Sequence, residues 1–88
     1  MTNTDITVNI VVPKAMGCSE SLVAPYDSTI LDVIRNIDQP FIIDKVIKNE
    51  KEFNKFILVY LNEERIKDPM IQLRKDSNIE IVIPMAGG

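Results

Sequence analysis

The sequence has no histidine and a single cysteine, Cys18, among its 88 residues. Histidine is the commonest metal ligand and general base in proteins, so its absence removes the usual means of metal binding and acid–base catalysis. A lone cysteine excludes an internal disulfide, and it excludes an iron–sulfur cluster, which needs about four ligands. We expect no metal site, no bound cofactor and no enzymatic side-chain chemistry. Cys18 is interpreted as an inert loop thiol in a reducing, cytoplasmic setting.

Long apolar runs and basic runs are missing as well. No segment approaches the ~20 apolar residues of a membrane-spanning helix. Residues 1–5 lack the basic and apolar regions of a signal peptide. The net charge is −3, and the lysines are scattered apart from a loose group at 45–55. Because phosphate neutralisation needs clustered Lys and Arg, we expect neither a nucleic-acid partner nor a membrane partner.

Apolar residues, which make up 45% of the chain, suffice for one core. The length predicts a single domain over residues 1–88. Alternating apolar residues predict a strand at 6–12 and a weaker strand at 20–25 that pairs with it as a hairpin. Thr29 and Asp32 have the spacing of a capping box. Apolar residues then recur at intervals of three and four, which predicts a helix from 30 that Pro40 ends by about Gln39.

The second half of the chain predicts further strands. The looser apolar spacing of residues 41–48 predicts either a short second helix or an ordered loop. An apolar run at 56–61 indicates a central strand, and 65–67 a short return strand. The last strand has Ile79, Ile81 and Ile83 pointing inward. The remaining expectations are a core position for Leu73 and a turn at 75–78. Together these elements predict an α+β fold, with a mixed sheet of four to five strands packed on one main helix and the last strand in a central position.

Glycine is also scarce, and its placement is unusual. Two of the three glycines are the final residues, Gly87 and Gly88. At the usual glycine frequency of about 7%, chance places such a pair at the end of roughly one chain in two hundred. Pro84 cannot donate to a sheet, so pairing should stop there and release residues 85–88. We predict a thin, mobile tail of Met85, Ala86 and Gly87 that carries the Gly88 carboxylate into the active site of another protein.

A second candidate site lies on the predicted sheet. If alternate residues of the central strand face the helix, then Phe56, Leu58 and Tyr60 face the other way, beside Val82 on the last strand. An exposed apolar face of this kind often marks a partner-docking surface. The alternative is that segment 41–53 folds back and covers it. The sequence leaves both open.

These residues resemble the MoaD/ThiS family of sulfur carriers over nearly the whole chain. Segment 29–34 is similar to the start of the family's helix, and 56–62 to its central strand with an asparagine turn. Segment 73–88 is similar to its C-terminal signature, which ends in Pro84-Met85-Ala86-Gly87-Gly88. The chain departs from the family pattern at two turns, where Glu63 and Ser77 replace the usual glycines.

The resemblance implies a ubiquitin-like β-grasp fold and a role as a protein co-substrate. An adenylating partner, similar to ubiquitin-activating enzymes, would use Mg-ATP to activate Gly88, which then becomes a thiocarboxylate. The first destination implied is molybdopterin synthesis, with this chain as the small subunit that partners the large subunit of molybdopterin synthase. Carriers for cysteine or thiamine biosynthesis or tRNA thiolation remain alternatives. So do a ubiquitin-like modifier that forms isopeptide bonds through Gly88 and a plain interaction module.

Overall fold

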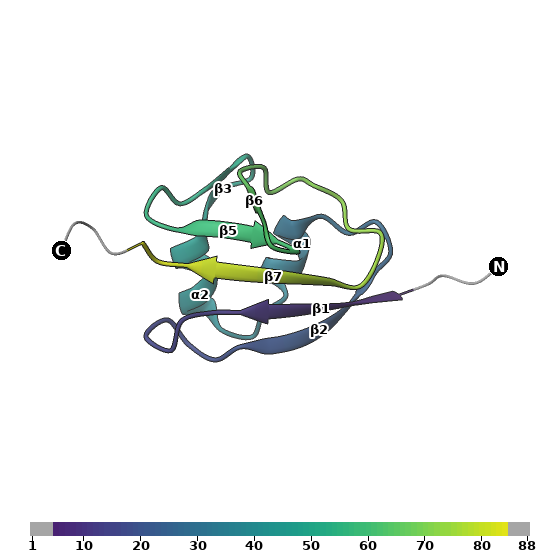
Figure 1. The fold of residues 1–88 in the computed structure, drawn as a ribbon, viewed down its shortest axis with the longest axis horizontal. Coiled ribbons are helices and arrows are strands. Elements are labelled where there is room, and N and C mark those ends of the chain that lie inside the picture. Colours follow the sequence, from purple (N-terminus) through teal and green to yellow (C-terminus); the bar gives the residue numbers. More distant parts are fainter. Residues whose placement is uncertain (1–4, 85–88) are drawn as a thin grey trace.

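The computed structural model describes residues 5–84, which form a five-stranded mixed sheet with two short helices against one face (Figure 1). The strands lie in the order β2-β1-β7-β5-β6, with β1 and β7 parallel and the other neighbours antiparallel. Their bounds are β1 Asp5–Val11, β2 Glu20–Pro25, β5 Leu58–Leu61, β6 Glu64–Ile66 and β7 Ser77–Val82. The α+β fold and the central position of the last strand are confirmed.

The β1–β2 hairpin follows from period-two alternation. Ile6, Val8 and Ile10 are buried while the residues between them are exposed. Successive side chains of a strand point to opposite faces, so this pattern buries one face of β1 beneath the helices. Val8 pairs with Leu22 on β2, which also packs against the core. The predicted hairpin is confirmed.

Helix α1 (Ile30–Arg35) begins at the predicted capping box. The Asp32 amide donates to Thr29 Oγ1 at 3.1 Å, and the Thr29 amide donates to Asp32 Oδ2 at 3.3 Å. The helix is shorter than expected, ending at Arg35 rather than near Gln39. Asn36 ends it, because its side chain donates to Asp32 O at 3.0 Å and its amide to Val33 O at 3.1 Å. Both bonds satisfy carbonyls that a continuing turn would use.

Pro40 starts a second helix and does not end the first. It occupies the first turn of α2 (Pro40–Val46), where its missing N–H costs nothing. A two-stranded hairpin of β3 (Ile47–Asn49) and β4 (Glu52–Phe53) follows. Ile42 and Val46 are fully buried in the same core as α1. Of the two possibilities for this segment, the short helix is therefore the one observed.

The centre of the core lies under β7. Ile79 is 0% exposed and sits between Ile10 on β1 and Leu61 on β5. Leu73 is buried as predicted. Ile83, predicted to point inward, is instead 41% exposed, because β7 ends at Val82 and the alternation ends with it.

The turn predicted at 75–78 is also too long, since β7 begins at Ser77. The Ser77 hydroxyl donates to Lys75 O at 2.8 Å, which closes the turn before the strand. Asn78 is already paired, because its amide donates to Asn62 Oδ1 at 2.9 Å and its carbonyl accepts from the Asn62 amide at 2.8 Å.

The turn between β5 and β6 consists of Asn62 and Glu63, which both have positive φ, at 49° and 74°. Leu61 pairs with Glu64 across this two-residue turn. Such turns twist with the strands but favour Asn-Gly, since only glycine adopts the second position without strain. Asn62 tolerates its conformation, whereas Glu63 does not. At the other departure from the family pattern, Ser77 and Asn78 lie in β7 and have no positive φ.

Replacing Glu63 with glycine is expected to stabilise the protein. The left-handed conformation costs a residue with a side chain about 1–2 kcal/mol, and added freedom in the unfolded chain returns about half of that. We expect urea denaturation of Glu63→Gly to give a free energy of unfolding about 0.5–1 kcal/mol higher. Glu64→Gly is the matched control, because Glu64 lies in β6 and should lose stability. Equal losses in both variants would contradict this account of the turn.

Candidate functional site

The chain leaves the sheet from its centre. β7 ends at Val82, two residues before Pro84, and its final residues lie at the same end of the molecule as the β1–β2 connection and α2 (Figure 1). Met85, Ala86, Gly87 and Gly88 lie outside the described residues. Their predicted role as a tail with a reactive carboxylate therefore stays a prediction, while the end of sheet pairing before Pro84 is observed.

Three of the four predicted docking residues share the sheet face opposite the helices. Leu58 pairs directly with Val82, and Tyr60 lies two residues along the same strand, between Glu80 and Arg65. Residues in register point to the same face. All three apolar side chains are half-buried. Segment 41–53 packs on the other side, because Ile42, Val46 and Phe53 contact the helix-side core.

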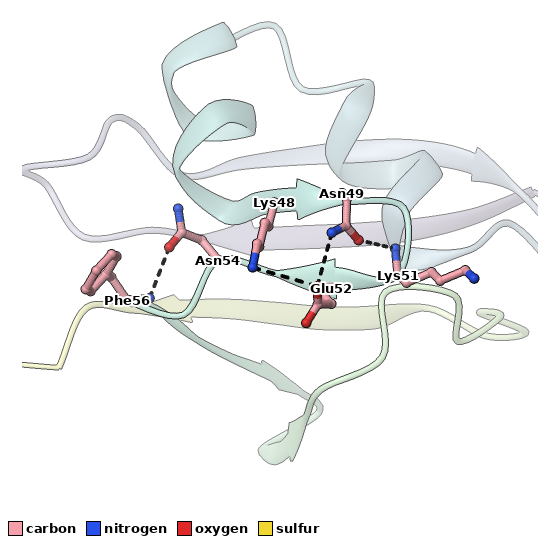
Figure 2. A network of polar contacts seen from close by, with 6 residues as sticks. All are labelled: Lys48, Asn49, Lys51, Glu52, Asn54 and Phe56. Atoms are coloured by element: carbon pink, nitrogen blue, oxygen red, sulfur yellow. Dashed lines mark hydrogen bonds and ion pairs between the residues drawn. The ribbon is translucent and has the colours of Figure 1, made fainter.

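Phe56 does not belong to this set, which corrects the predicted strand at 56–61. The Asn54 side chain accepts from the Phe56 amide at 3.1 Å, and Asn54 O accepts from the Ile57 amide at 3.3 Å. These bonds close an Asx-type turn and occupy the backbone groups that a strand would use. β5 consequently begins only at Leu58. Figure 2 shows the Phe56 ring directed away from the β3–β4 hairpin.

A polar network fixes the segment that carries Phe56 (Figure 2). Asn49 Oδ1 accepts from the Lys51 amide at 2.8 Å, and Asn49 Nδ2 donates to Glu52 Oε1 at 3.1 Å. Lys48 Nζ lies 3.9 Å from the same carboxylate. The Asn54 amide donates to Val46 O at 2.8 Å, which ties the end of the hairpin to α2. The turn at Phe56 is thereby held against the second helix.

Phe56 lines a pocket of about 280 Å³ at the end of the molecule where the chain leaves the sheet. We call it the Ile83 pocket. Met16 and Ile57 line it and are buried, whereas Phe41, Phe56 and Ile83 line it and are exposed. Lys45 is its charged residue, with Nζ 5.3 Å from the centre of the Phe41 ring. The sequence prediction included Phe56 but missed the α2 residues, because the Phe41–Lys45 spacing of four brings side chains together only on a helix.

The loop that carries Met16 is held in place by Gln39. Gln39 Oε1 accepts from the Cys18 amide at 3.0 Å, and Nε2 donates to Cys18 O at 3.0 Å and to Glu20 Oε2 at 2.6 Å. Gly17 must be glycine here, because an added Cβ would lie 2.5 Å from Gln39 Oε1 and 2.9 Å from Ile42 Cδ1. Cys18 is exposed in this loop, and its inertness stays a prediction.

Charged groups elsewhere in residues 5–84 do not form a second site. No three His, Cys, Asp or Glu side chains gather there as metal ligands. The Arg74–Asp27 ion pair, with Nε and Oδ1 2.7 Å apart, joins the segment that follows β2 to the segment that precedes β7. The hydrogen bond from Arg74 to Asp27 raises the pKa of the guanidinium, which stays charged. The two helices of this part of the chain are too short to cross a membrane.

Comparison with known proteins shows a shared fold. No protein-family model and no curated protein matches the sequence. Among solved structures, the solution structure of the Haloferax volcanii HVO 2177 protein is similar, with a TM-score of 0.75 and 17% sequence identity. The match covers 96% of this chain and 88% of that chain. At this identity the likeness concerns the small α+β fold alone.

Proposed function

We propose that the protein is a sulfur carrier of the MoaD/ThiS type with a ubiquitin-like β-grasp fold, and that its reactive group is the C-terminal carboxylate of Gly88. The proposed destination of the sulfur is molybdopterin synthesis, with cysteine or thiamine biosynthesis and tRNA thiolation as alternatives. The chain acts as a co-substrate of an adenylating enzyme that resembles ubiquitin-activating enzymes and uses Mg-ATP. The large subunit of molybdopterin synthase is the proposed acceptor partner.

The observation that carries this proposal is the position of β7. The strand that precedes Pro84-Met85-Ala86-Gly87-Gly88 pairs with β1 as far as Glu80 and with β5 as far as Val82, so the sheet holds the chain up to two residues before Pro84. A partner that binds the sheet would therefore hold Pro84, from which the last four residues follow, at a defined position. Positioning of a reacting group is a large source of rate enhancement.

The proposed chemistry needs no side chain from this protein. One Gly88 carboxylate oxygen attacks the α-phosphorus of ATP and expels pyrophosphate, which leaves an acyl-adenylate. A hydrosulfide donor then attacks the acyl carbon and expels AMP, which leaves a thiocarboxylate. Adenylation supplies a good leaving group to a carboxylate that otherwise resists nucleophiles. No electrons are exchanged, so the cycle needs no redox cofactor.

Intact-mass measurement tests this function. The protein is incubated with a ubiquitin-activating-type adenylating enzyme encoded in the same genome, Mg-ATP and a sulfide donor. We expect a mass increase equal to the difference between sulfur and oxygen, located by fragmentation to the C-terminal residue. Omission of ATP is the control, and it should leave the mass unchanged.

The same measurement distinguishes the alternative classes. If incubation in lysate with ATP instead joins Gly88 to lysine side chains of other proteins with loss of water, then the protein is a ubiquitin-like modifier. An unchanged mass in both settings, with confirmed enzyme activity on another carrier, would indicate a plain interaction module and contradict the proposal.

A further inference from the structure

The Ile83 pocket gathers exposed apolar side chains that a single domain normally hides. Phe41 is 55% exposed and Phe56 is 78% exposed, although the chain has only three phenylalanines. Together with Ile83 they surround buried Met16 and Ile57. Contiguous exposed apolar surface usually marks a binding site, and aromatic side chains around a pocket are typical anchors of protein interfaces.

The charge at this pocket is positive in a chain whose net charge is −3. Lys45 lines the pocket over the Phe41 ring, and the ion pairs found within residues 5–84, Lys48–Glu52 and Arg74–Asp27, do not involve it. Lys14 and Lys55 are exposed neighbours, in sequence, of the lining residues Ala15 and Phe56. A ligand that fits this combination carries an apolar side chain next to a carboxylate.

The pocket also lies where the last residues of the chain begin. Ile83 lines it, and Gly88 follows five residues later, so the carboxylate lies within about 18 Å of Ile83 even along a fully extended chain. We propose that the Ile83 pocket receives an aliphatic or aromatic side chain flanked by acidic residues from the adenylating enzyme. This identification of the partner rests on the proposed function, whereas the ligand chemistry rests on the pocket alone.

Short peptides test the ligand chemistry without any enzyme. Acetylated, amidated Asp-Asp-Leu-Asp-Asp is titrated into ¹⁵N-labelled protein, in parallel with Lys-Lys-Leu-Lys-Lys and Asp-Asp-Ser-Asp-Asp. We expect the acidic leucine peptide to shift the amide signals of Phe41, Lys45, Phe56 and Ile83. The basic peptide should bind about two- to fivefold more weakly, the scale of an exposed ion pair, and the serine peptide should not bind measurably.

Charge reversal provides the matched controls. Lys45→Glu should invert the preference between the acidic and basic leucine peptides, whereas Lys75→Glu, in the exposed turn before β7, should leave it unchanged. Equal effects of the two substitutions would mean that net charge, not the pocket, controls binding. Signal shifts confined to Leu58, Tyr60 and Val82 would place binding on the sheet face and overturn the proposal.

The chain's own last residues are the competing occupant of the pocket. A variant that ends at Pro84 should bind the acidic leucine peptide with unchanged affinity. If truncation alone moves the signals of Phe41 and Phe56 and tightens peptide binding, then residues 85–88 occupy the pocket and the proposed partner does not.

An adenylation assay separates this inference from the proposed function. Phe56→Ser, at a largely exposed position, should raise the KM for the carrier about tenfold with unchanged kcat, as expected for a lost interface anchor. An unchanged KM alongside normal adenylation would overturn the pocket as the enzyme's docking site and leave the proposed function intact. Absence of adenylation with retained peptide binding would contradict the proposed function and leave the ligand chemistry of the pocket intact.

Discussion

Deletion of Gly88 is expected to reduce adenylation by the proposed activating enzyme at least about 100-fold without changing the stability of the fold. Each residue of an extended chain spans about 3.5 Å, so the shortened chain presents its carboxylate one residue too early. Misplacement of a reacting group by even ~1 Å costs on the order of 100-fold in rate. The measurement is ATP–pyrophosphate exchange at fixed carrier and enzyme concentrations, together with a thermal unfolding curve.

The matched control removes one residue from the opposite terminus. Deletion of Thr2 shortens the chain equally and leaves the C-terminal sequence intact, so the exchange rate should stay at the wild-type value. Full activity after deletion of Gly88 would mean that the reactive group is not this carboxylate. A matching loss in both deletion variants would point to a general defect in folding or in enzyme binding.

Replacement of Ile79 by alanine is expected to have the largest effect on stability. The side chain is fully buried in the central strand, and such truncations cost about 2–5 kcal/mol. A domain of 88 residues has a free energy of unfolding of roughly 4–13 kcal/mol, so much of it would be lost. At about 4–8 °C per kcal/mol for a domain of this size, Tm should fall by about 8–40 °C.

Ile83→Ala is the control for this loss. Ile83 is the same residue type four positions later, beyond the end of β7 and partly exposed. Its truncation should change the free energy of unfolding by less than about 1 kcal/mol. Calorimetry of both variants checks the difference, and equal shifts would contradict the assignment of Ile79 to the centre of the core.

The fold was predictable where local signals and burial agree. Alternating residues in β1 and the Thr29–Asp32 capping box each favour one structure, and both are confirmed. The ends of elements were not predictable from the same signals. Asn36 ends α1 through bonds to Asp32 and Val33 that a sequence pattern does not reveal, and Pro40 is compatible with either ending a helix or starting one.

One local turn, at Asn54–Ile57, separates Phe56 from the other three predicted docking residues. Phe56 continues the apolar alternation of Leu58 and Tyr60, which is why the sequence groups them. The Asn54 side chain accepts a hydrogen bond from the Phe56 amide in a turn, so β5 begins only at Leu58. The pocket that results joins Met16, Phe41 and Ile83 from three distant parts of the chain. Such a site depends on tertiary packing, so a single sequence without relatives gives no signal for it.

The parallel pairing of β1 with β7 also has a mechanical consequence. β1 follows the N-terminal residues and β7 precedes the C-terminal ones, and the two ends of the described chain lie at opposite ends of the molecule (Figure 1). Tension between the termini therefore loads the hydrogen bonds between these strands in shear, together rather than one after another. If the proposed enzyme pulls on the last residues as it binds them, the parallel β1–β7 hydrogen bonds would resist the separation of β7 from the sheet.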